Sequence, residues 1–156
     1  MPDEFRDKAF YFEDYQVGDC FPSVTHEVTA EEIIAFAKQW DPQPWHIDEE
    51  AARQSIFGGL TTCSAHTFAI FSTISPKWLN GAIQQPIASL GFDEMRMLAP
   101  IFAGDTIQCE SNIEMVRPSK SKDDRGIAAS RCILYNQKRE EVFSILATFL
   151  IRKRPG

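Results

Sequence analysis

The chain contains no apolar run long enough to cross a bilayer and no Cys-x-x-Cys pair. It also lacks an excess of positive charge, because 16 Lys and Arg residues against 22 Asp and Glu residues give a net charge of −6. A protein that binds nucleic acid broadly needs a basic face. We therefore expect neither a nucleic-acid partner nor a membrane partner.

Secretion signals and disulfides are also not expected. The first eight residues mix charges where a secretory signal needs a basic start and an apolar run, so we expect a cytoplasmic protein. Without a signal, scattered cysteines are typical of reduced thiols, most of them in the core. The chain has four such residues, namely Cys20, Cys63, Cys109 and Cys132.

The composition is that of one folded globular domain. Hydrophobic residues make up 44% and aromatic residues 12% of the 156 residues. A chain of this length can bury a sizeable core as one unit. We expect a single domain over residues 1–156, with no internal repeat. The Gly-x-Ser-x-Gly elbow of serine hydrolases is absent.

The first half of the sequence predicts three helices. Thr29-Ala-Glu-Glu32 has the form of a capping box, which predicts a helix that Pro42 stops after Trp40 or Asp41. A second short helix is expected from about Asp48 to residue 53. A third runs from Ser64 to Ser75, and apolar residues surround it almost completely, so we expect it to be buried.

The second half alternates like an antiparallel sheet. Residues 107–115 place Ile107, Cys109, Ser111, Ile113 and Met115 on one face and polar residues on the other. Two further strands are expected over residues 127–135 and 142–151, joined by the polar turn 136–140. The last is nearly all apolar, so we expect an interior strand. Together these elements predict an α+β fold in which an antiparallel sheet covers a buried helix.

A possible acid/base pair follows the first predicted helix. Asp41 and His46 lie five residues apart, in a loop that Pro42 and Pro44 stiffen and that we expect to be non-helical. A carboxylate and an imidazole held this way can share one water and move its protons. The alternative is that Asp41 only ends the helix and His46 is a surface residue.

Several motifs occur in an order that resembles one known family. They are Phe12-Glu13-Asp14-Tyr15-x-Val17-Gly18-Asp19, Asp41-x-Gln43-Pro-x-His46-x-Asp48, Phe57-Gly58-Gly59-Leu60, His66-Thr67, Gly91-Phe92-Asp93-Glu94-Met95-Arg96, Ala103-Gly104-Asp105-Thr106, Arg117-Pro118-Ser119-Lys120-Ser121 and Asp124-Arg125-Gly126. The ordered set resembles the MaoC-like acyl dehydratases, also called R-specific enoyl-CoA hydratases. The resemblance covers nearly the whole chain.

The resemblance implies a fold and catalytic roles. It implies the hot dog fold, an antiparallel sheet curled around one central helix, here from Ser64 to Ser75. It also implies that Asp41 and His46 hold the catalytic water. Gln43 stands where the family has an asparagine, and Ser64 falls opposite a glycine whose backbone N–H binds the thioester oxygen. Gly59 allows close backbone approach just before that helix.

We therefore expect an acyl-CoA hydratase/dehydratase that adds water reversibly to a trans-2-enoyl thioester. The substrate is bound to coenzyme A or to an acyl carrier, and no other cofactor is expected. The alternatives are a hot dog acyl-CoA thioesterase and a non-catalytic acyl-binding domain. The resemblance further implies a homodimer or a dimer of dimers.

Two other groups of residues suggest binding. Lys120, Lys122 and Arg125 lie in the best local basic cluster, which either contacts the coenzyme A phosphates or is a solvated hairpin tip. Cys63-x-x-His66 places both side chains on one helix face, where they could join His46 and Asp48 around a metal. We expect no metal, because these spacings match no standard zinc pattern.

Overall fold

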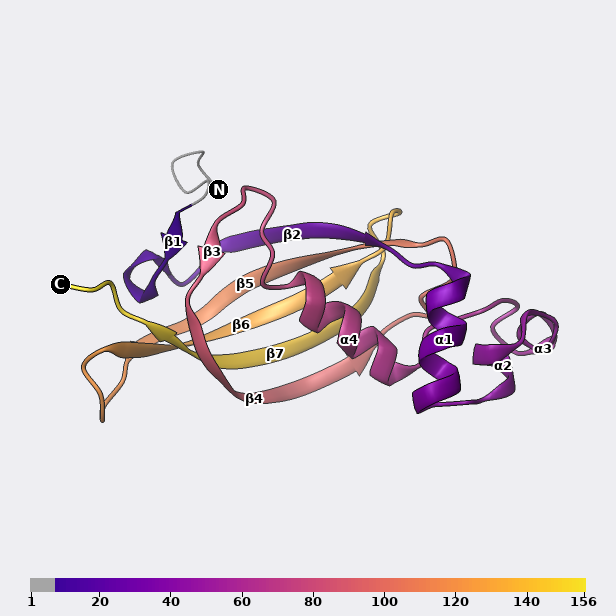
Figure 1. Cartoon of the computed structure of the whole chain (residues 1–156). Helices are drawn as coiled ribbons and strands as arrows, with labels where there is room; N and C mark the ends of the chain where they lie inside the picture. Colours follow the sequence, from indigo (N-terminus) through magenta and orange to yellow (C-terminus); the bar gives the residue numbers. More distant parts are fainter. Residues whose placement is uncertain (1–7) are drawn as a thin grey trace.

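The centre of the protein is a five-stranded antiparallel sheet in the strand order β2-β5-β6-β7-β4 (Figure 1). The computed structural model describes residues 8–156; the charged segment 1–7 lies outside this description. The strands are β2 (Cys20–Glu27), β4 (Pro86–Met97), β5 (Thr106–Pro118), β6 (Arg125–Tyr135) and β7 (Glu141–Arg152). Two short strands, β1 (Ala9–Phe10) and β3 (Ile83–Gln84), pair in parallel beside it.

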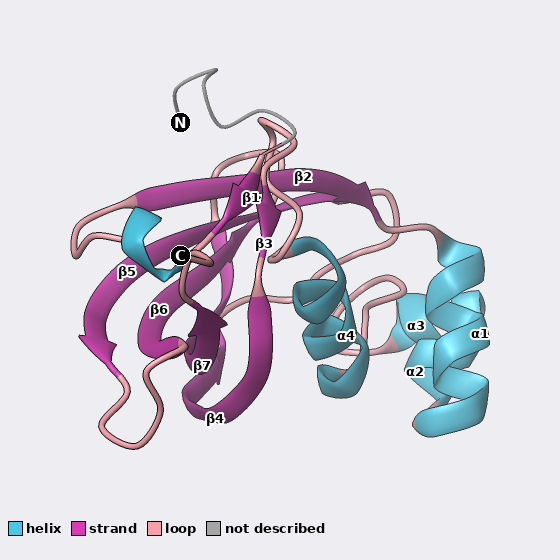
Figure 2. Ribbon diagram, turned by 60° about the vertical axis from the view of Figure 1, so that its left-hand side comes forward, coloured by secondary structure: helices cyan, strands magenta, loops and turns pink. Residues whose placement is uncertain are grey.

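The sheet curls around one helix, α4, and three further helices gather at one end of the molecule (Figures 1 and 2). The helices are α1 (Ala30–Trp40), α2 (Pro44–Ile47), α3 (Glu49–Gln54) and α4 (Ser64–Ile74), and a 3-10 turn, η2, covers Phe12–Asp14. The predicted α+β fold, with an antiparallel sheet around a central helix, is confirmed. Within residues 8–156, no helix is both long and apolar enough to cross a membrane.

Local signals placed the ends of α1, α3 and α4 to within one residue. The Thr29 hydroxyl caps α1 by accepting a hydrogen bond from the Glu32 N–H at 3.1 Å, and α1 ends at Trp40 as predicted. The α4 helix ends at Ile74, one residue before the predicted end. The expected capping box is incomplete, because the Glu32 carboxylate accepts hydrogen bonds from His26 and His66 instead of from the Thr29 backbone.

The prediction that α4 is buried on nearly all sides is wrong for the single chain. Ile70, Phe71 and Ile74 are buried against the sheet, whereas the side that carries Ser72 and Thr73 is exposed. The sheet covers only one side of the helix (Figure 2). An exposed side of small residues on a central helix leaves room for a ligand or for another copy of the chain.

The predicted alternation along β5 holds up to Ile113 and then changes face. Ile107, Cys109 and Ile113 are buried. Ile113 opposes Ser130 of β6, and Met115, two residues later, opposes the adjacent residue Ala129. The register between β5 and β6 therefore shifts by one residue between Ile113 and Met115. Adjacent residues of β6 point to opposite faces, so this bulge moves Met115 away from the face predicted for it.

The β7 strand is an interior strand, as predicted, whereas β4 is an unprotected edge. β7 pairs with β6 on one side and β4 on the other. Large apolar side chains along and just after β4 are exposed, namely Leu90, Phe92, Met95, Met97 and Leu98, with exposed fractions of 42–53%. An exposed apolar edge strand is a template for pairing with another chain.

Candidate active site

His46 lies in a helical turn rather than in the non-helical loop predicted for it. Gln43 precedes the α2 turn and Pro44 occupies its first position. The His46 N–H donates to the Gln43 carbonyl at 2.9 Å, and the Asp48 N–H donates to the Pro44 carbonyl at 3.0 Å. Proline favours this position because its φ angle is already helical and its missing N–H would have no partner there. The proline therefore builds a helical turn that fixes the histidine.

The imidazole of His46 is buried and held in one tautomer. Its exposed fraction is 7%, and Nδ1 lies 2.7 Å from the backbone oxygen of Thr61. A carbonyl oxygen only accepts, so Nδ1 carries the proton and Nε2 of the neutral ring keeps a lone pair. Nε2 accepts a hydrogen bond from the indole N–H of Trp45 at 3.2 Å. The ring is therefore oriented as a base, and its unprotonated nitrogen, Nε2, faces the Trp45 indole.

The two tryptophans flanking the loop differ in their contacts. Trp45 is 36% exposed, and its ring lies 6.0 Å from the His46 ring, edge to face. Trp40 is 65% exposed. Trp45 therefore contacts the imidazole directly, whereas Trp40 is largely exposed to solvent.

Asp41 lies at the C-terminal end of α1, immediately before the α2 turn. Its N–H donates to the Ala37 carbonyl at 2.9 Å, and its own carbonyl accepts from the Gln43 N–H at 2.8 Å. The residue is partly exposed. These backbone bonds place Asp41 and His46 at the same junction of α1 and α2. The Gln43 side chain makes no capping bond to that turn, so its amide remains available.

The start of α4 is connected to His46 through Thr61. Thr61, whose carbonyl holds the imidazole, comes three residues before Ser64, the first residue of α4. Cys63 precedes the helix, and its side chain makes no capping hydrogen bond. Ser64 is exposed. An uncapped helix start presents free N–H groups and a positive dipole end, which favour an oxyanion.

The glycine pair before α4 is required at one of its two positions. Gly58 has a φ of +70°, a conformation that side chains rarely adopt. At Gly59 an added Cβ would lie 3.6 Å from the Phe102 ring, which is ordinary contact. The close approach expected at Gly59 is therefore not what requires glycine in this loop. After this loop, the Thr62 N–H donates to the Ile101 carbonyl at 3.0 Å. This bond attaches the segment before α4 to the chain that follows β4.

Thr61 and Glu32 are site residues that the sequence did not reveal. Thr61 is 2% exposed, and its hydroxyl is buried without a partner among the described residues. Glu32 accepts from His66 Nε2 at 3.1 Å and from His26 Nε2 at 2.9 Å. No local sequence pattern predicts either role. Thr61 acts through its backbone oxygen, and Glu32 contacts His66, which is distant in the chain.

His66 packs behind the start of α4. Its ring stacks on Phe36 of α1, with ring centres 4.5 Å apart. Burial lowers the pKa of His66, and the neighbouring Glu32 carboxylate opposes that shift. The stacking of His66 on Phe36 packs the first turn of α4 against α1, the helix that precedes Asp41. In the part of the chain that the structure describes, no three or more His, Cys, Asp and Glu side chains are grouped as a metal site.

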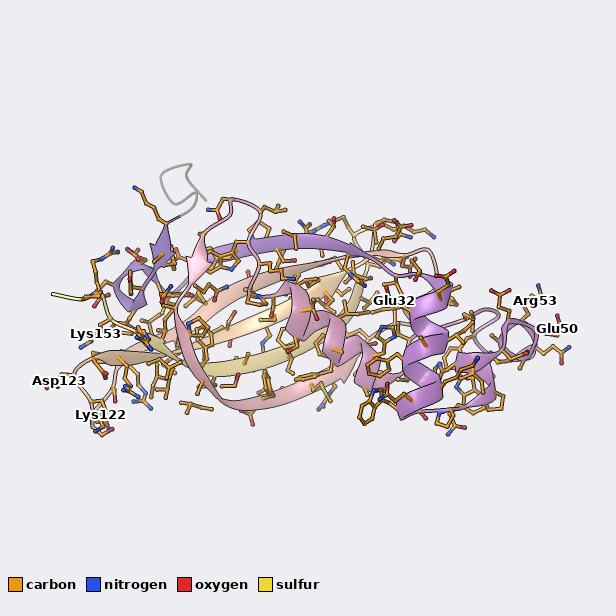
Figure 3. All side chains as sticks on the ribbon, viewed as in Figure 1. Glu32, Glu50, Arg53, Lys122, Asp123 and Lys153 are labelled. Carbon is orange, nitrogen blue, oxygen red and sulfur yellow. The ribbon has the colours of Figure 1, made fainter. Side chains whose placement is uncertain are left out.

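The basic cluster lies far from His46 within one chain. Lys120 and Lys122 lie in the hairpin loop between β5 and β6, and Arg125 is the first residue of β6. Lys122 lies at one end of the molecule, and Arg53 of α3 lies at the other (Figure 3). Arg125 forms an ion pair with Asp124, with Nε and Oδ1 2.6 Å apart. A ligand bound at His46 therefore cannot meet this hairpin of the same chain without spanning the molecule.

The architecture places the protein in the hot dog class, with a long antiparallel sheet around α4 and an Asp-x4-His turn tied to the start of that helix. The chain belongs to the family described as the MaoC like domain, whose model matches residues 18–130.

Solved structures and curated proteins agree with this assignment. The MaoC-like dehydratase from Rhodospirillum rubrum is 37% identical, with a TM-score of 0.84 over 94% of this chain and 99% of that chain. The (R)-hydratase from A. caviae is 22% identical, with a TM-score of 0.69 over 92% of this chain and 99% of that chain, and supports the fold. Mesaconyl-CoA hydratase from Cereibacter sphaeroides is 27% identical over 149 residues.

Curated relatives differ in length. The chain covers 98% of an uncharacterized Bacillus subtilis protein, YdeM, at 25% identity, and the match spans 90% of this chain. The mesaconyl-CoA hydratase match spans 92% of this chain but only 41% of the hydratase. The match to protein MaoC from Klebsiella aerogenes, at 29% identity, spans 76% of this chain and 35% of that protein.

Proposed function

We propose that the protein is an acyl-CoA hydratase/dehydratase that adds water reversibly to a trans-2-enoyl thioester. The observation that carries the proposal is the His46 imidazole, neutral at Nε2, fixed through Nδ1 to Thr61 beside the uncapped start of α4. The names of two relatives support the same chemistry, since one is a mesaconyl-CoA hydratase and another a MaoC-like dehydratase.

In the proposed mechanism a water lies between the Asp41 carboxylate and His46 Nε2. The carboxylate orients the water, and Nε2 takes its proton as the hydroxide adds to Cβ of the enoyl group. The Trp45 indole must release Nε2 for this step. His46 then returns the proton to Cα. The Gln43 amide, at the same turn, is a further group able to orient the water.

The thioester oxygen is proposed to lie at the first turn of α4, near Ser64. Negative charge develops on that oxygen as hydroxide adds to Cβ, and backbone N–H groups aimed at it stabilise the enolate. The N–H donor survives the serine that replaces the family's glycine, because only proline removes a backbone N–H. The chemistry needs no cofactor besides the thioester carrier.

A combined assay on crotonyl-CoA tests the proposed function. Loss of the enoyl absorbance without release of free thiol is the expected result. Thiol release without prior loss of the enoyl group would instead identify a thioesterase. Saturable binding with neither reaction would identify a non-catalytic acyl-binding domain.

We propose a homodimer formed through β4. The strand runs from the β5–β6 hairpin end of the molecule toward the end that carries α1 and α2 (Figure 1). Antiparallel pairing of two β4 edges about a two-fold axis covers their exposed apolar side chains and removes the open edge. It also brings the basic hairpin of the second copy to the α1–α2 end of the first. The coenzyme A phosphates would then contact the hairpin of one subunit and the acyl group the site of the other.

Reversing two lysine charges in that hairpin tests the phosphate contact. Replacing Lys120→Glu together with Lys122→Glu is expected to weaken acyl-CoA binding about tenfold at low salt, less so as salt screens the charges. Lys77→Glu is the matched control, since Lys77 hydrogen-bonds to β2 at the sheet edge opposite β4. Equal dissociation constants for the wild type and the double variant in titration calorimetry would remove these lysines from the substrate site.

A further inference from the structure

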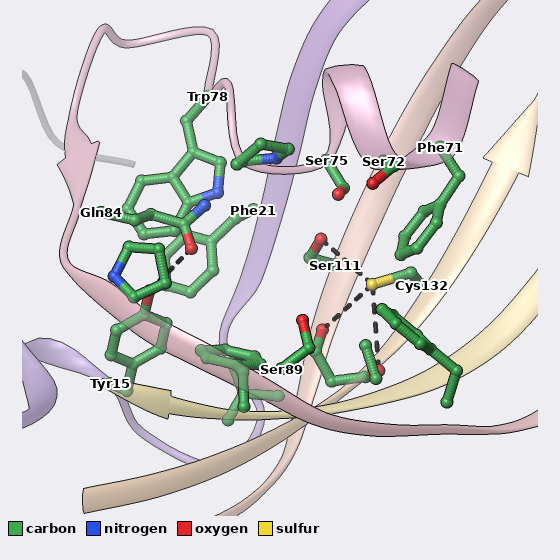
Figure 4. A pocket seen from close by; sticks show the side chains of 17 residues that line it. Tyr15, Phe21, Phe71, Ser72, Ser75, Trp78, Gln84, Ser89, Ser111 and Cys132 are labelled. Atoms are coloured by element: carbon green, nitrogen blue, oxygen red, sulfur yellow. Dashed lines mark hydrogen bonds between the residues drawn. The ribbon is translucent and has the colours of Figure 1, made fainter. Parts of the chain in front are cut away.

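A cavity of about 180 Å³ lies between the C-terminal half of α4 and the sheet (Figure 4). Its walls are largely aromatic and include Tyr15, Phe21, Phe71, Trp78 and Phe149. Ser72 of α4 and Ser89 of β4 are exposed at its rim, whereas Ser111 and Ser130 are buried at its base. The cavity therefore opens beside α4 and β4.

Several polar groups in this apolar wall lack a strong partner. The indole N–H of Trp78 is buried, with 4% of the residue exposed, and has no hydrogen-bond partner within the part of the chain that the structure describes. The Ser111 hydroxyl lies 3.5 Å from the Cys132 thiol, and the Ser130 hydroxyl lies 3.6 Å from the same thiol. Thiols are weak donors and acceptors. Buried polar groups with such poor partners are typical of a site that a ligand or water completes.

The cavity also contains hydrogen-bond donors, but its described lining has no carboxylate, amine, guanidinium or imidazole group. The Tyr15 hydroxyl donates to Gln84 Oε1 at 3.0 Å, which leaves the Gln84 amide nitrogen as a donor near Trp78 (Figure 4). Burial, with Asp14 nearby, raises the pKa of Tyr15 well above its ordinary value, so the phenol stays neutral. No Asp, Glu, Lys, Arg or His occurs among the described residues that line the cavity.

We propose that this cavity binds the far end of the substrate's acyl group and selects one that carries an uncharged oxygen, a hydroxyl or a carbonyl. The proposal rests on the proposed hydratase function and names its substrate class. The N–H groups of Trp78 and Gln84 can donate to a ligand oxygen, and the serine hydroxyls can either donate to or accept from a ligand group. A carboxylate is disfavoured, because burying a charge without a counter-ion is costly.

The position of the cavity along α4 sets the length of the acyl group. Ser64 and Ser72 are eight residues apart on the helix, which corresponds to about 12 Å along its axis. A thioester carbonyl at Ser64 therefore needs an extended, medium-length chain to place its far end in the cavity. An apolar cavity of about 150 Å³ accommodates benzene, so this one has room for the last few atoms of the chain.

Calorimetric binding of decanoyl-CoA and 10-hydroxydecanoyl-CoA tests the proposal without turnover, because both chains are saturated. The hydroxylated ligand is expected to bind about tenfold more tightly, as one buried hydrogen bond to an otherwise unpartnered group allows. Ser111→Ala and Trp78→Phe are each expected to reduce that ratio to about twofold or less. Ser144→Ala is the matched control, since Ser144 precedes the buried Ile145 of β7 and therefore points to the other face of the sheet.

Equal or tighter binding of decanoyl-CoA by the wild type would overturn the proposal, as would an unchanged ratio in Ser111→Ala. Absence of binding by both ligands would overturn it as well. Thermal unfolding checks that the variants are folded, and Ser111→Ala decides the result if Trp78→Phe does not fold. Hydration of trans-2-decenoyl-CoA is measured separately. A clear preference for the hydroxylated ligand without hydration would support the cavity and reject the proposed reaction.

Discussion

Replacing Asp41 with asparagine or His46 with alanine is expected to slow enoyl-CoA hydration by about 100-fold or more, the range for loss of an acid/base group. Asparagine keeps the shape of Asp41 but removes its charge, and alanine removes the Nε2 base of His46. The double variant should lose less than the product of the two single losses, because both residues act on one water. Initial rates on crotonyl-CoA, with equal amounts of folded enzyme, give the comparison.

Asp48→Asn is the matched control for this experiment. Asp48 lies in the same segment and caps α3, its carboxylate accepting from the Ala51 N–H at 2.7 Å. Asparagine caps helices about as well as aspartate, so this variant should keep nearly full activity. Turnover close to that of the wild type in Asp41→Asn or His46→Ala would reject the role assigned to that residue.

Placing charges on β4 is expected to separate the proposed dimer. Leu90 and Met95 are 53% and 45% exposed in the single chain. In a two-fold interface, Leu90→Glu with Met95→Glu brings like charges into a surface that must otherwise be apolar. We expect sedimentation velocity to show the wild type as a dimer at micromolar concentration and the double variant as a monomer. Hydration should fall about tenfold or more if the second copy completes the substrate site.

Ile56→Glu controls for the added charge, because Ile56 is 96% exposed in the loop between α3 and α4 and is not part of β4. This variant should remain dimeric. A wild-type protein that sediments as a stable monomer at micromolar concentration would reject the assembly and, with it, the contribution of the second basic hairpin.

Local signals in the sequence predicted much of the fold. Thr29 and Asp48 cap helices by accepting a hydrogen bond from the N–H three residues later. Because these contacts are local, the sequence predicts where α1 and α3 begin. The alternation along β5 predicted its buried face up to Ile113. The bulge before Met115 was not predictable, because it depends on the pairing of β5 with β6. The exposed side of α4 was missed for a related reason, since its apolar residues do not show which side the sheet covers.

The candidate site was predictable only where its residues are close in sequence. The Asp41–His46 spacing singled out both side chains as candidates. The loop that carries them was wrongly expected to be non-helical, because Pro44 begins a helical turn there. The contact of His46 with the Thr61 carbonyl joins residues fifteen apart, and the link of Glu32 to His66 joins residues thirty-four apart. No local pattern encodes such contacts. The cavity beside α4 is likewise formed by residues from separate strands and helices.

Isotope labelling tests the central claim most directly. The enzyme is incubated with crotonyl-CoA in water enriched in ¹⁸O and deuterium, and the product is analysed by mass spectrometry and NMR. Addition of one water across the double bond predicts ¹⁸O at C3, deuterium at C2 and an intact thioester. Incorporation of ¹⁸O into a free carboxylate with release of coenzyme A, and no label at C3, would contradict the account.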